Sequence, residues 1–135
     1  MTTNRAKILV VDDDPDFREA MESILIAASY GVVTASNVAE GTQKILAERP
    51  DLILLDIMMD SLFDGYSLCH AIRTSKEFEC VRDTPVIFVS AVREIAGSRF
   101  GFKGEDQGLT APEDYIDKPV KPADLLARIE RFLKK

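Results

Sequence analysis

Leu52-Ile53-Leu54-Leu55-Asp56 decides the fold, because four aliphatic residues without polar alternation end on a carboxylate. Such a run is typical of a strand buried on both faces, and strands of this kind belong to parallel sheets. Ile8–Val11 is a second such run and leads into Asp12-Asp13-Asp14, and Val86–Val89 is a third and leads into Ser90. The chain therefore repeats one pattern, in which a buried strand carries a reactive side chain at its carboxyl end.

Helical segments alternate with these strands. Apolar residues recur at helical spacing in four segments: Phe17–Ala28, Val38–Leu46, Tyr66–Ile72 and Leu125–Leu133. Shorter strands are predicted at Gly31–Ala35 and Tyr115-Ile116. Asp14 before Pro15 is typical of a helix start, Asn37 with Glu40 resembles a capping box, and Asp64-Gly65 is a turn signal. Alternating strands and helices predict right-handed βαβ units and a doubly wound sheet.

Composition and charge favour one soluble domain, residues 1–135 with a core of about 6–134. The net charge of −6, from 23 acidic and 17 basic residues, argues against nonspecific nucleic-acid binding. No apolar run approaches the ~20 residues of a membrane span, and Met1–Arg5 lacks the apolar segment of a signal peptide. Cys69 and Cys80 are expected to be reduced thiols, so we expect a cytoplasmic protein.

The strand-end residues are expected to lie together. In open parallel sheets the chemistry lies just past the carboxyl ends of the strands, so Asp12, Asp13, Asp56, Ser90 and Lys118 should meet at one edge. Clustered carboxylates repel one another unless a cation lies among them. Hard oxygen ligands beside a lysine favour Mg²⁺ and a phosphoryl group. Each residue alone has a plainer explanation, such as a loop hydroxyl or a solvated charge, and only their order along the chain favours a site.

The same stretches resemble the receiver domain of two-component response regulators, of the single-domain type found in chemotaxis regulators. The resemblance is carried by Ile8–Asp14, Asp51–Met59, Asp64-Gly65, Pro85–Ala91 and Lys118-Pro119. It covers nearly the whole chain in order. It implies an α/β, flavodoxin-like fold, with a doubly wound five-stranded parallel sheet of order 2-1-3-4-5 and helices on both faces.

The resemblance also implies a role for each acidic residue. Asp56 is then the phosphoacceptor, a carboxylate nucleophile that forms an acyl phosphate, and it also belongs to the metal site. Asp13 is a direct Mg²⁺ ligand, Asp12 acts through a bound water, and the backbone carbonyl of Met58 is a further ligand. Asp60 adds a negative charge nearby, either over the metal or facing water.

Four further residues receive roles in the same way. Ser90 is expected to hydrogen-bond a phosphoryl oxygen, and Lys118 to pair with the phosphoryl charge, with Pro119 fixing the turn after it. Tyr115 lies where the family often places an aromatic switch residue, although packing on the last helix explains it equally well. His70 has no partner at a useful spacing and is predicted on a helix surface.

The function implied is acceptance of a phosphoryl group from a histidine kinase or a histidine phosphotransfer protein. Phosphorylation would then change binding of a downstream protein or output domain, without direct contact to nucleic acid or membrane. Slow hydrolysis of its own acyl phosphate leaves its status as an enzyme uncertain. Two alternatives stay open: a degenerate receiver that only binds partners, and a haloacid-dehalogenase-type phosphatase, which would need an Asp where Met58 stands.

One segment departs from the family pattern. The stretch from Ser90 to Lys118 is longer than usual, so residues 91–114 contain an insertion of unassigned conformation. Four glycines at 97, 101, 104 and 108 disfavour a regular helix there. We expect Ala96–Gly108 to be the least ordered part of the domain, with Phe100 or Phe102 packing back on it.

Overall fold

A computed structural model describes residues 6–57, 64–90 and 112–133. The strands are β1 (Lys7–Val11), β2 (Gly31–Ala35), β3 (Leu52–Asp56), β4 (Val86–Ser90) and β5 (Asp114–Asp117). The α-helices are α1 (Pro15–Ala27), α2 (Val38–Glu48), α3 (Asp64–Thr74) and α6 (Pro122–Leu133), and η1 (Lys76–Val81) is a 3₁₀ helix. Within these residues no helix is both long enough and apolar enough to cross a membrane.

The strands form one parallel sheet in the order β2-β1-β3-β4-β5, which confirms the predicted topology. The chain leaves β1 toward one edge of the sheet and returns through β3 toward the other. The switch between the two directions therefore lies between β1 and β3, where doubly wound sheets hold their ligands. β3 is buried along its whole length, as its unbroken aliphatic run predicts.

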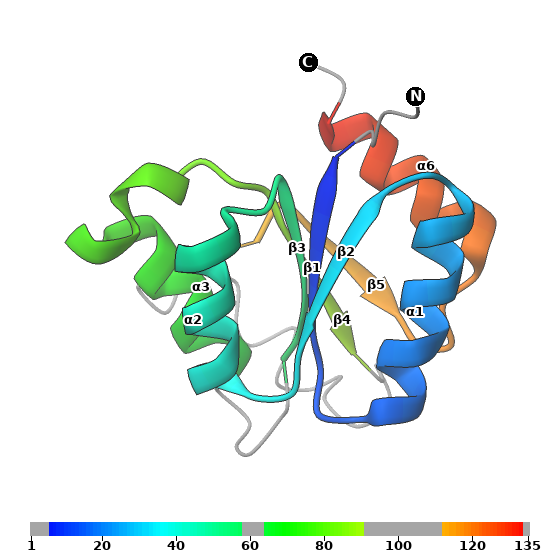
Figure 1. Cartoon of the computed structure of the whole chain (residues 1–135), viewed down its shortest axis with the longest axis horizontal. Helices are drawn as coiled ribbons and strands as arrows, with labels where there is room; N and C mark the ends of the chain where they lie inside the picture. The colour runs from blue at the N-terminus through cyan, green and yellow to red at the C-terminus, as the bar shows by residue number, and fades with distance from the viewer. Residues whose placement is uncertain (1–5, 58–63, 91–111, 134–135) are drawn as a thin grey trace.

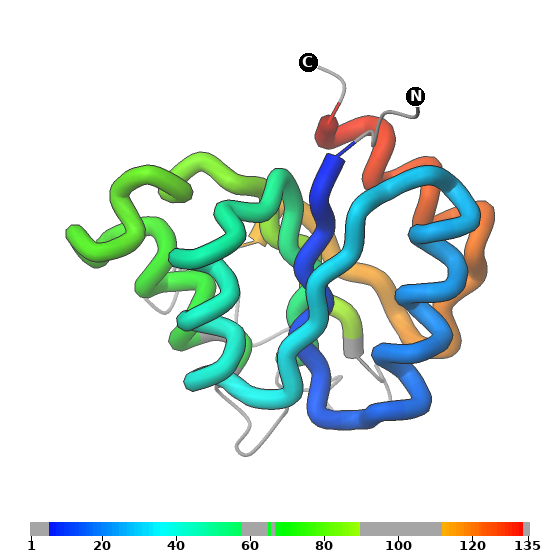
Figure 2. Tube along the Cα trace, viewed as in Figure 1, coloured from blue at the N-terminus to red at the C-terminus, as the bar shows by residue number. Residues whose placement is uncertain are grey.

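Two helical layers cover the sheet, as Figure 1 shows, with α1 and α6 on one face and α2 and α3 on the other. Figure 2 traces the same arrangement along the Cα atoms. Alternate strand residues belong to opposite cores. The core under α1 and α6 contains Met21, Leu25, Leu125 and Ile129 together with Ile8, Val10, Leu52 and Leu54. The core under α2 and α3 contains Ile45, Leu68 and Ile72 together with Leu9, Val11, Ile53 and Leu55.

Both predicted helix starts are present. The Asp14 carboxylate accepts a hydrogen bond from the Asp16 backbone N–H at 3.0 Å, which caps α1. The Asn37 side chain accepts from the Glu40 N–H at 2.8 Å and caps α2. The capping box differs in one respect, because the Glu40 carboxylate accepts from the N–H of Ser36 rather than from that of Asn37. The backbone of Ser36, the residue before the helix cap, is therefore also held in place.

The region after β3 differs most from the sequence expectation. Asp64-Gly65 is not a separate turn, because α3 begins at Asp64. The 3₁₀ helix η1 follows α3, and no periodic pattern indicates it; Phe78 anchors it in the core. The predictions for Met58, for Asp60 and for the glycine-rich segment with Phe100 and Phe102 lie outside the described residues.

Candidate functional site

Strand register brings two carboxylates level with each other. Val11 is paired with Leu55 across β1 and β3, so Asp12 and Asp56 are the next residues on neighbouring strands. Asp12 continues the strand direction, since its N–H donates to the Ala35 carbonyl at 3.1 Å. The central position of β3 therefore places Asp56 between the acidic residues after β1 and the end of β4.

Asp12, Asp13 and Asp56 form one carboxylate cluster. One oxygen from each lies within 4.8 Å of the others. Asp12 is 1% exposed and Asp56 is 6% exposed, whereas Asp13 is exposed to solvent. Buried carboxylates this close repel one another, and a cation offsets that repulsion. Oxygen ligands with one member open to water fit Mg²⁺, which keeps part of its hydration shell in proteins.

Asp12 is held in one orientation. One carboxylate oxygen accepts from the Asp14 backbone N–H at 2.9 Å, and the other accepts from the Lys118 ammonium at 3.0 Å. The Arg18 guanidinium donates to the Asp12 carbonyl at 2.7 Å and so fixes the backbone as well. Burial raises the pKa of the Asp12 carboxyl, while the Asp14 N–H and the Lys118 ammonium oppose that shift. With both oxygens engaged, Asp12 suits the predicted role of holding a metal-bound water.

Lys118 supplies the positive charge of the site. It follows β5, the strand at one edge of the sheet. The Asp12 carboxylate that it binds follows β1, and strands β4 and β3 lie between β5 and β1. The side chain is 24% exposed, and its Nζ lies 4.3 Å from the centre of the Phe17 ring on α1. The peptide bond between Lys118 and Pro119 is cis. The predicted meeting of Lys118 with the carboxylates is therefore present, since its ammonium binds the Asp12 carboxylate.

Gly65 lets α3 approach the residue that carries the central carboxylate. A Cβ atom at this position would lie 2.7 Å from the Asp56 carbonyl oxygen and 2.7 Å from the Ile57 Cα. The Gly65 N–H also donates to the Ile57 carbonyl at 3.0 Å. This glycine is thus required by close contact between helix and strand end, and not by a turn conformation.

Three other predicted residues are placed less completely. Ser90 ends β4, and since Asp56 is paired with Val89, Ser90 lies one residue further along the neighbouring strand. The structure describes its backbone, so the role of its hydroxyl stays a prediction, as does that of the Met58 carbonyl. The Tyr115 ring packs edge-on against Phe88, with centroids 5.7 Å apart, which accounts for packing and leaves the switch role a prediction.

Some contributing residues have no clear sequence signal. On α1, Arg18 binds the Asp12 carbonyl and the Phe17 ring lies under the Lys118 ammonium. In the sequence, the helical spacing of Phe17 indicates only that it belongs to the buried face of a helix. His70 lies on α3 and is half-buried. Cys69 is buried and Cys80 exposed, and both are free thiols.

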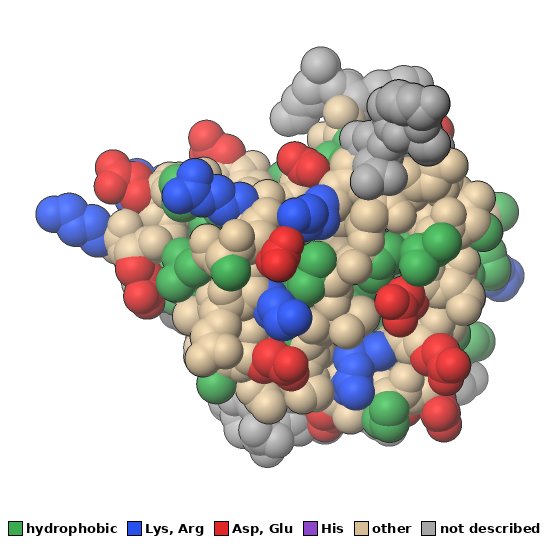
Figure 3. Space-filling model, in the orientation of Figure 1, with side chains coloured by type: hydrophobic (Ala, Val, Ile, Leu, Met, Phe, Trp, Pro, Cys, Tyr) green, Lys and Arg blue, Asp and Glu red, His purple; other side chains and the backbone are tan. Residues whose placement is uncertain are grey.

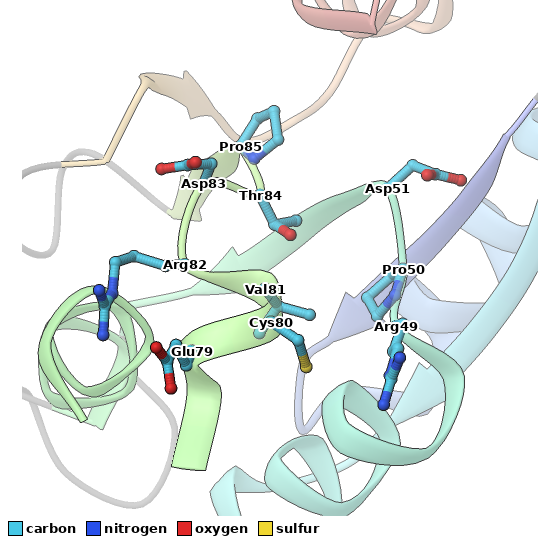
Figure 4. Close-up of a pocket in the computed structure, with 10 residues that line it drawn as sticks. All are labelled: Arg49, Pro50, Asp51, Glu79, Cys80, Val81, Arg82, Asp83, Thr84 and Pro85. Atoms are coloured by element: carbon cyan, nitrogen blue, oxygen red, sulfur yellow. The ribbon is translucent and has the colours of Figure 1, made fainter. Parts of the chain in front are cut away.

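Away from the carboxylate cluster, a depression lies at the opposite end of the sheet, near the amino ends of β3 and β4. Figure 4 shows its lining, which comes from the connection before β3 and from η1 with the connection before β4. It contains Arg49 and Arg82 with Asp51, Glu79 and Asp83, so its charges are mixed. The face in Figure 3 likewise has acidic and basic side chains interspersed. Because their charges are mixed, neither the depression nor this face is as good a candidate reaction site as the carboxylate cluster.

Comparison with known proteins gives a consistent result. The profile of the family described as "Response regulator receiver domain" matches residues 8–130. A probable transcriptional regulator ycf27 from Pyropia yezoensis is 35% identical over 135 residues, which are 100% of this chain and 50% of that protein. The chain spans about half the length of the curated relatives it matches.

Solved structures agree with the sequence comparison. A putative response regulator from Chloroflexus aurantiacus is 28% identical with a TM-score of 0.79, covering 96% of this chain and 98% of that one. The receiver domain of the sensor histidine kinase PA1611 from Pseudomonas aeruginosa is 25% identical with a TM-score of 0.74, over 96% and 98% of the two chains. That structure has a magnesium ion coordinated in its active-site cleft.

Proposed function

Because the chain belongs to the response regulator receiver-domain family, we propose that it accepts a phosphoryl group on Asp56 in a two-component or phosphorelay system. The donor is a phosphohistidine of a sensor kinase or a histidine phosphotransfer protein in the cytoplasm. The observation that carries the proposal is the cluster itself. Asp56 is buried at the end of the central strand, within 4.8 Å of two further carboxylates, with the Lys118 ammonium bound to one of them.

The proposed reaction is an in-line displacement at phosphorus. A carboxylate oxygen of Asp56 attacks, an acyl phosphate P–O bond forms, and the P–N bond to the donor imidazole breaks. The bonding electrons leave with the imidazole nitrogen, and the departing imidazole is neutral when its other ring nitrogen carries a proton. Phosphoryl transfer needs positioning and charge neutralisation more than covalent chemistry from the protein.

Different residues of this chain provide the positioning and the charge neutralisation. Asp13 is exposed and available as a direct metal ligand, Asp12 is oriented to hold water, and the Met58 carbonyl is proposed as a further ligand. Bound Mg²⁺ would offset the charge of the carboxylates and of the phosphoryl oxygens. Lys118 is proposed to move its ammonium from Asp12 toward a phosphoryl oxygen, and the Ser90 hydroxyl to donate to another.

Phosphorylation is proposed to change partner binding through Ser90 and Tyr115. Tyr115 is half-buried against Phe88, two residues before Ser90 on β4, so a movement at Ser90 has a short packed path to the Tyr115 ring. Several relatives are named as transcriptional regulators and are about twice as long as this chain. The downstream partner is therefore proposed to be either a linked output domain or a separate protein.

The direct test is labelling with acetyl phosphate. The protein should gain one phosphoryl group, detected by intact-protein mass spectrometry, when Mg²⁺ is present and should gain none after chelation. Asp56→Asn should stay unlabelled, and slow loss of the label after removal of acetyl phosphate would report autodephosphorylation. A protein that binds partners without phosphorylation would remain unlabelled throughout. A phosphatase would release inorganic phosphate repeatedly and would act on phosphate esters.

A further inference from the structure

The Lys118 ammonium lies over the face of an aromatic ring that the proposed function does not use. Its Nζ is 4.3 Å from the centroid of Phe17, within the ~6 Å at which a cation is attracted to a ring face. The ring comes from the first turn of α1, which follows β1, whereas Lys118 follows β5. Phe17 is half-buried and packs against the core beneath α1 and α6, which fixes the plane of the ring.

We propose that Phe17 is a positioning residue that holds the Lys118 ammonium at the carboxylate cluster. The proposal rests on the proposed role of Lys118 in charge pairing with a phosphoryl group. A lysine side chain is flexible and strongly hydrated, and ordering it opposes binding through lost rotamer entropy. Since the Lys118 side chain is 24% exposed, a fixed surface under its ammonium reduces that entropy loss before the phosphoryl group arrives.

The ring has an advantage over the other partner of Lys118. Asp12 binds the ammonium at 3.0 Å, but it also belongs to the carboxylate cluster proposed to hold Mg²⁺. A carboxylate oxygen that serves a metal-bound water is less available to an ammonium. An aromatic ring carries no ionisable group and takes no hard cation as a ligand, so Phe17 can retain Lys118 in both states. The Lys118 ammonium can therefore release Asp12 while the Phe17 ring still holds it near the carboxylate cluster.

A plainer role for Phe17 is core packing alone. Leucine fills most of the same apolar space without a ring, so Phe17→Leu separates packing from the cation–ring contact. Phe17→Tyr keeps the ring and serves as the conservative rescue. Phe132 offers a matched control, because it is also half-buried against the same core and its ring lies 5.3 Å from the Arg131 guanidinium, away from the site.

The contact itself is tested by NMR of the unmodified protein. The ε-methylene protons of Lys118, assigned with Lys118→Arg, should lie upfield of exposed lysines because of the Phe17 ring current. The upfield shift should vanish in Phe17→Leu and persist in Phe17→Tyr and in Phe132→Leu. A wild-type Lys118 signal at the position of exposed lysines would overturn the proposal without any variant.

The positioning role is tested by binding of beryllofluoride, a phosphoryl mimic, in the presence of Mg²⁺. Phe17→Leu should weaken beryllofluoride binding about two- to fivefold, the range expected for one partly exposed cation–ring contact. Phe17→Tyr and Phe132→Leu should bind as the wild type does. If Phe17→Leu does not fold, Phe17→Met takes its place. Equal binding by the ring-free variant and the wild type would overturn the proposal.

The two readouts also separate this proposal from the one it rests on. If the wild type fails to bind beryllofluoride with Mg²⁺, the proposed function fails, and the positioning role fails with it even where the ring-current shift is present. If the wild type binds beryllofluoride and only the ring-dependent difference is missing, the proposed function stands and Phe17 is a core residue.

Discussion

Replacement of Gly65 should damage both the stability of the domain and the site. In Gly65→Ala the new Cβ would lie 2.7 Å from the Asp56 carbonyl oxygen and from the Ile57 Cα, both backbone atoms that cannot rotate away. To reach 3.0–3.4 Å, which is still a tight contact, the start of α3 and the end of β3 must separate by roughly 0.3–0.7 Å. The carboxylate of Asp56 is carried on the backbone that has to move.

The magnitude follows from two opposing effects. Overpacking of this kind costs about 1–3 kcal/mol, and removal of a glycine from a helix returns about 0.5–1 kcal/mol. The net fall in the free energy of unfolding is then about 1–2 kcal/mol, or about 3–10 °C in Tm for a domain of this size. A displacement of about half an ångström at the nucleophile should also weaken beryllofluoride binding about tenfold.

Gly41→Ala is the matched control. Gly41 is also a buried helical glycine on the same face of the sheet, but its added Cβ would meet the Val11 methyl groups at 3.4 Å, an ordinary contact. It should raise the free energy of unfolding by about 0.5–1 kcal/mol and leave beryllofluoride binding unchanged. Urea unfolding and beryllofluoride titration of both variants decide the matter. If Gly65→Ala proves as stable and as responsive as Gly41→Ala, the close contact of α3 with Asp56 does not position the site.

Three other predictions concern the metal, the contacts of Arg73 on α3, and the thiols. Asp13→Ala should greatly weaken Mg²⁺ binding while preserving the fold, and calorimetric affinity equal to that of the wild type would remove Asp13 from the site. Arg73→Ala should lower the free energy of unfolding by about 2 kcal/mol, because its guanidinium binds two backbone carbonyls and the Glu113 carboxylate; a urea-derived loss under about 0.5 kcal/mol would count against that clamp. Cys80 is exposed and should react with an aromatic disulfide reagent at pH 8. Burial raises the pKa of Cys69 to about 11, so Cys69 should stay unreactive until the protein unfolds. Equal reaction rates of the two thiols in the folded protein would contradict this prediction.

The sheet and the members of the carboxylate cluster could be predicted because they depend on local patterns. An unbroken aliphatic run specifies a buried parallel strand, and the residue that follows it must then lie at the carboxyl edge. Asp12 and Asp56 needed only that rule and the strand order to be placed side by side. The helix start at Asp14 needed only its own side chain and the next turn of backbone.

Contacts between distant segments could not be predicted in the same way. Arg73 and Glu113 are 40 residues apart, and their ion pair exists only once α3 and β5 have packed on the sheet. Gly65 indicates a turn by composition, whereas its real constraint is the Asp56 backbone against it. Phe17 has helical spacing typical of a core position, and nothing local reveals that Lys118 from the other end of the chain lies over its ring. In each case tertiary packing decides what the residue contacts.

The most direct measurement is identification of the carboxylate that carries the phosphoryl group. After labelling with acetyl phosphate and Mg²⁺, reduction of the acyl phosphate with borohydride converts the modified aspartate into homoserine, which peptide mass spectrometry can place in the sequence. Homoserine is expected at position 56, because Asp56 ends the central strand of the sheet with the other two carboxylates beside it. Homoserine at Asp12 or Asp13 instead, with position 56 unchanged, would contradict the assignment of the nucleophile.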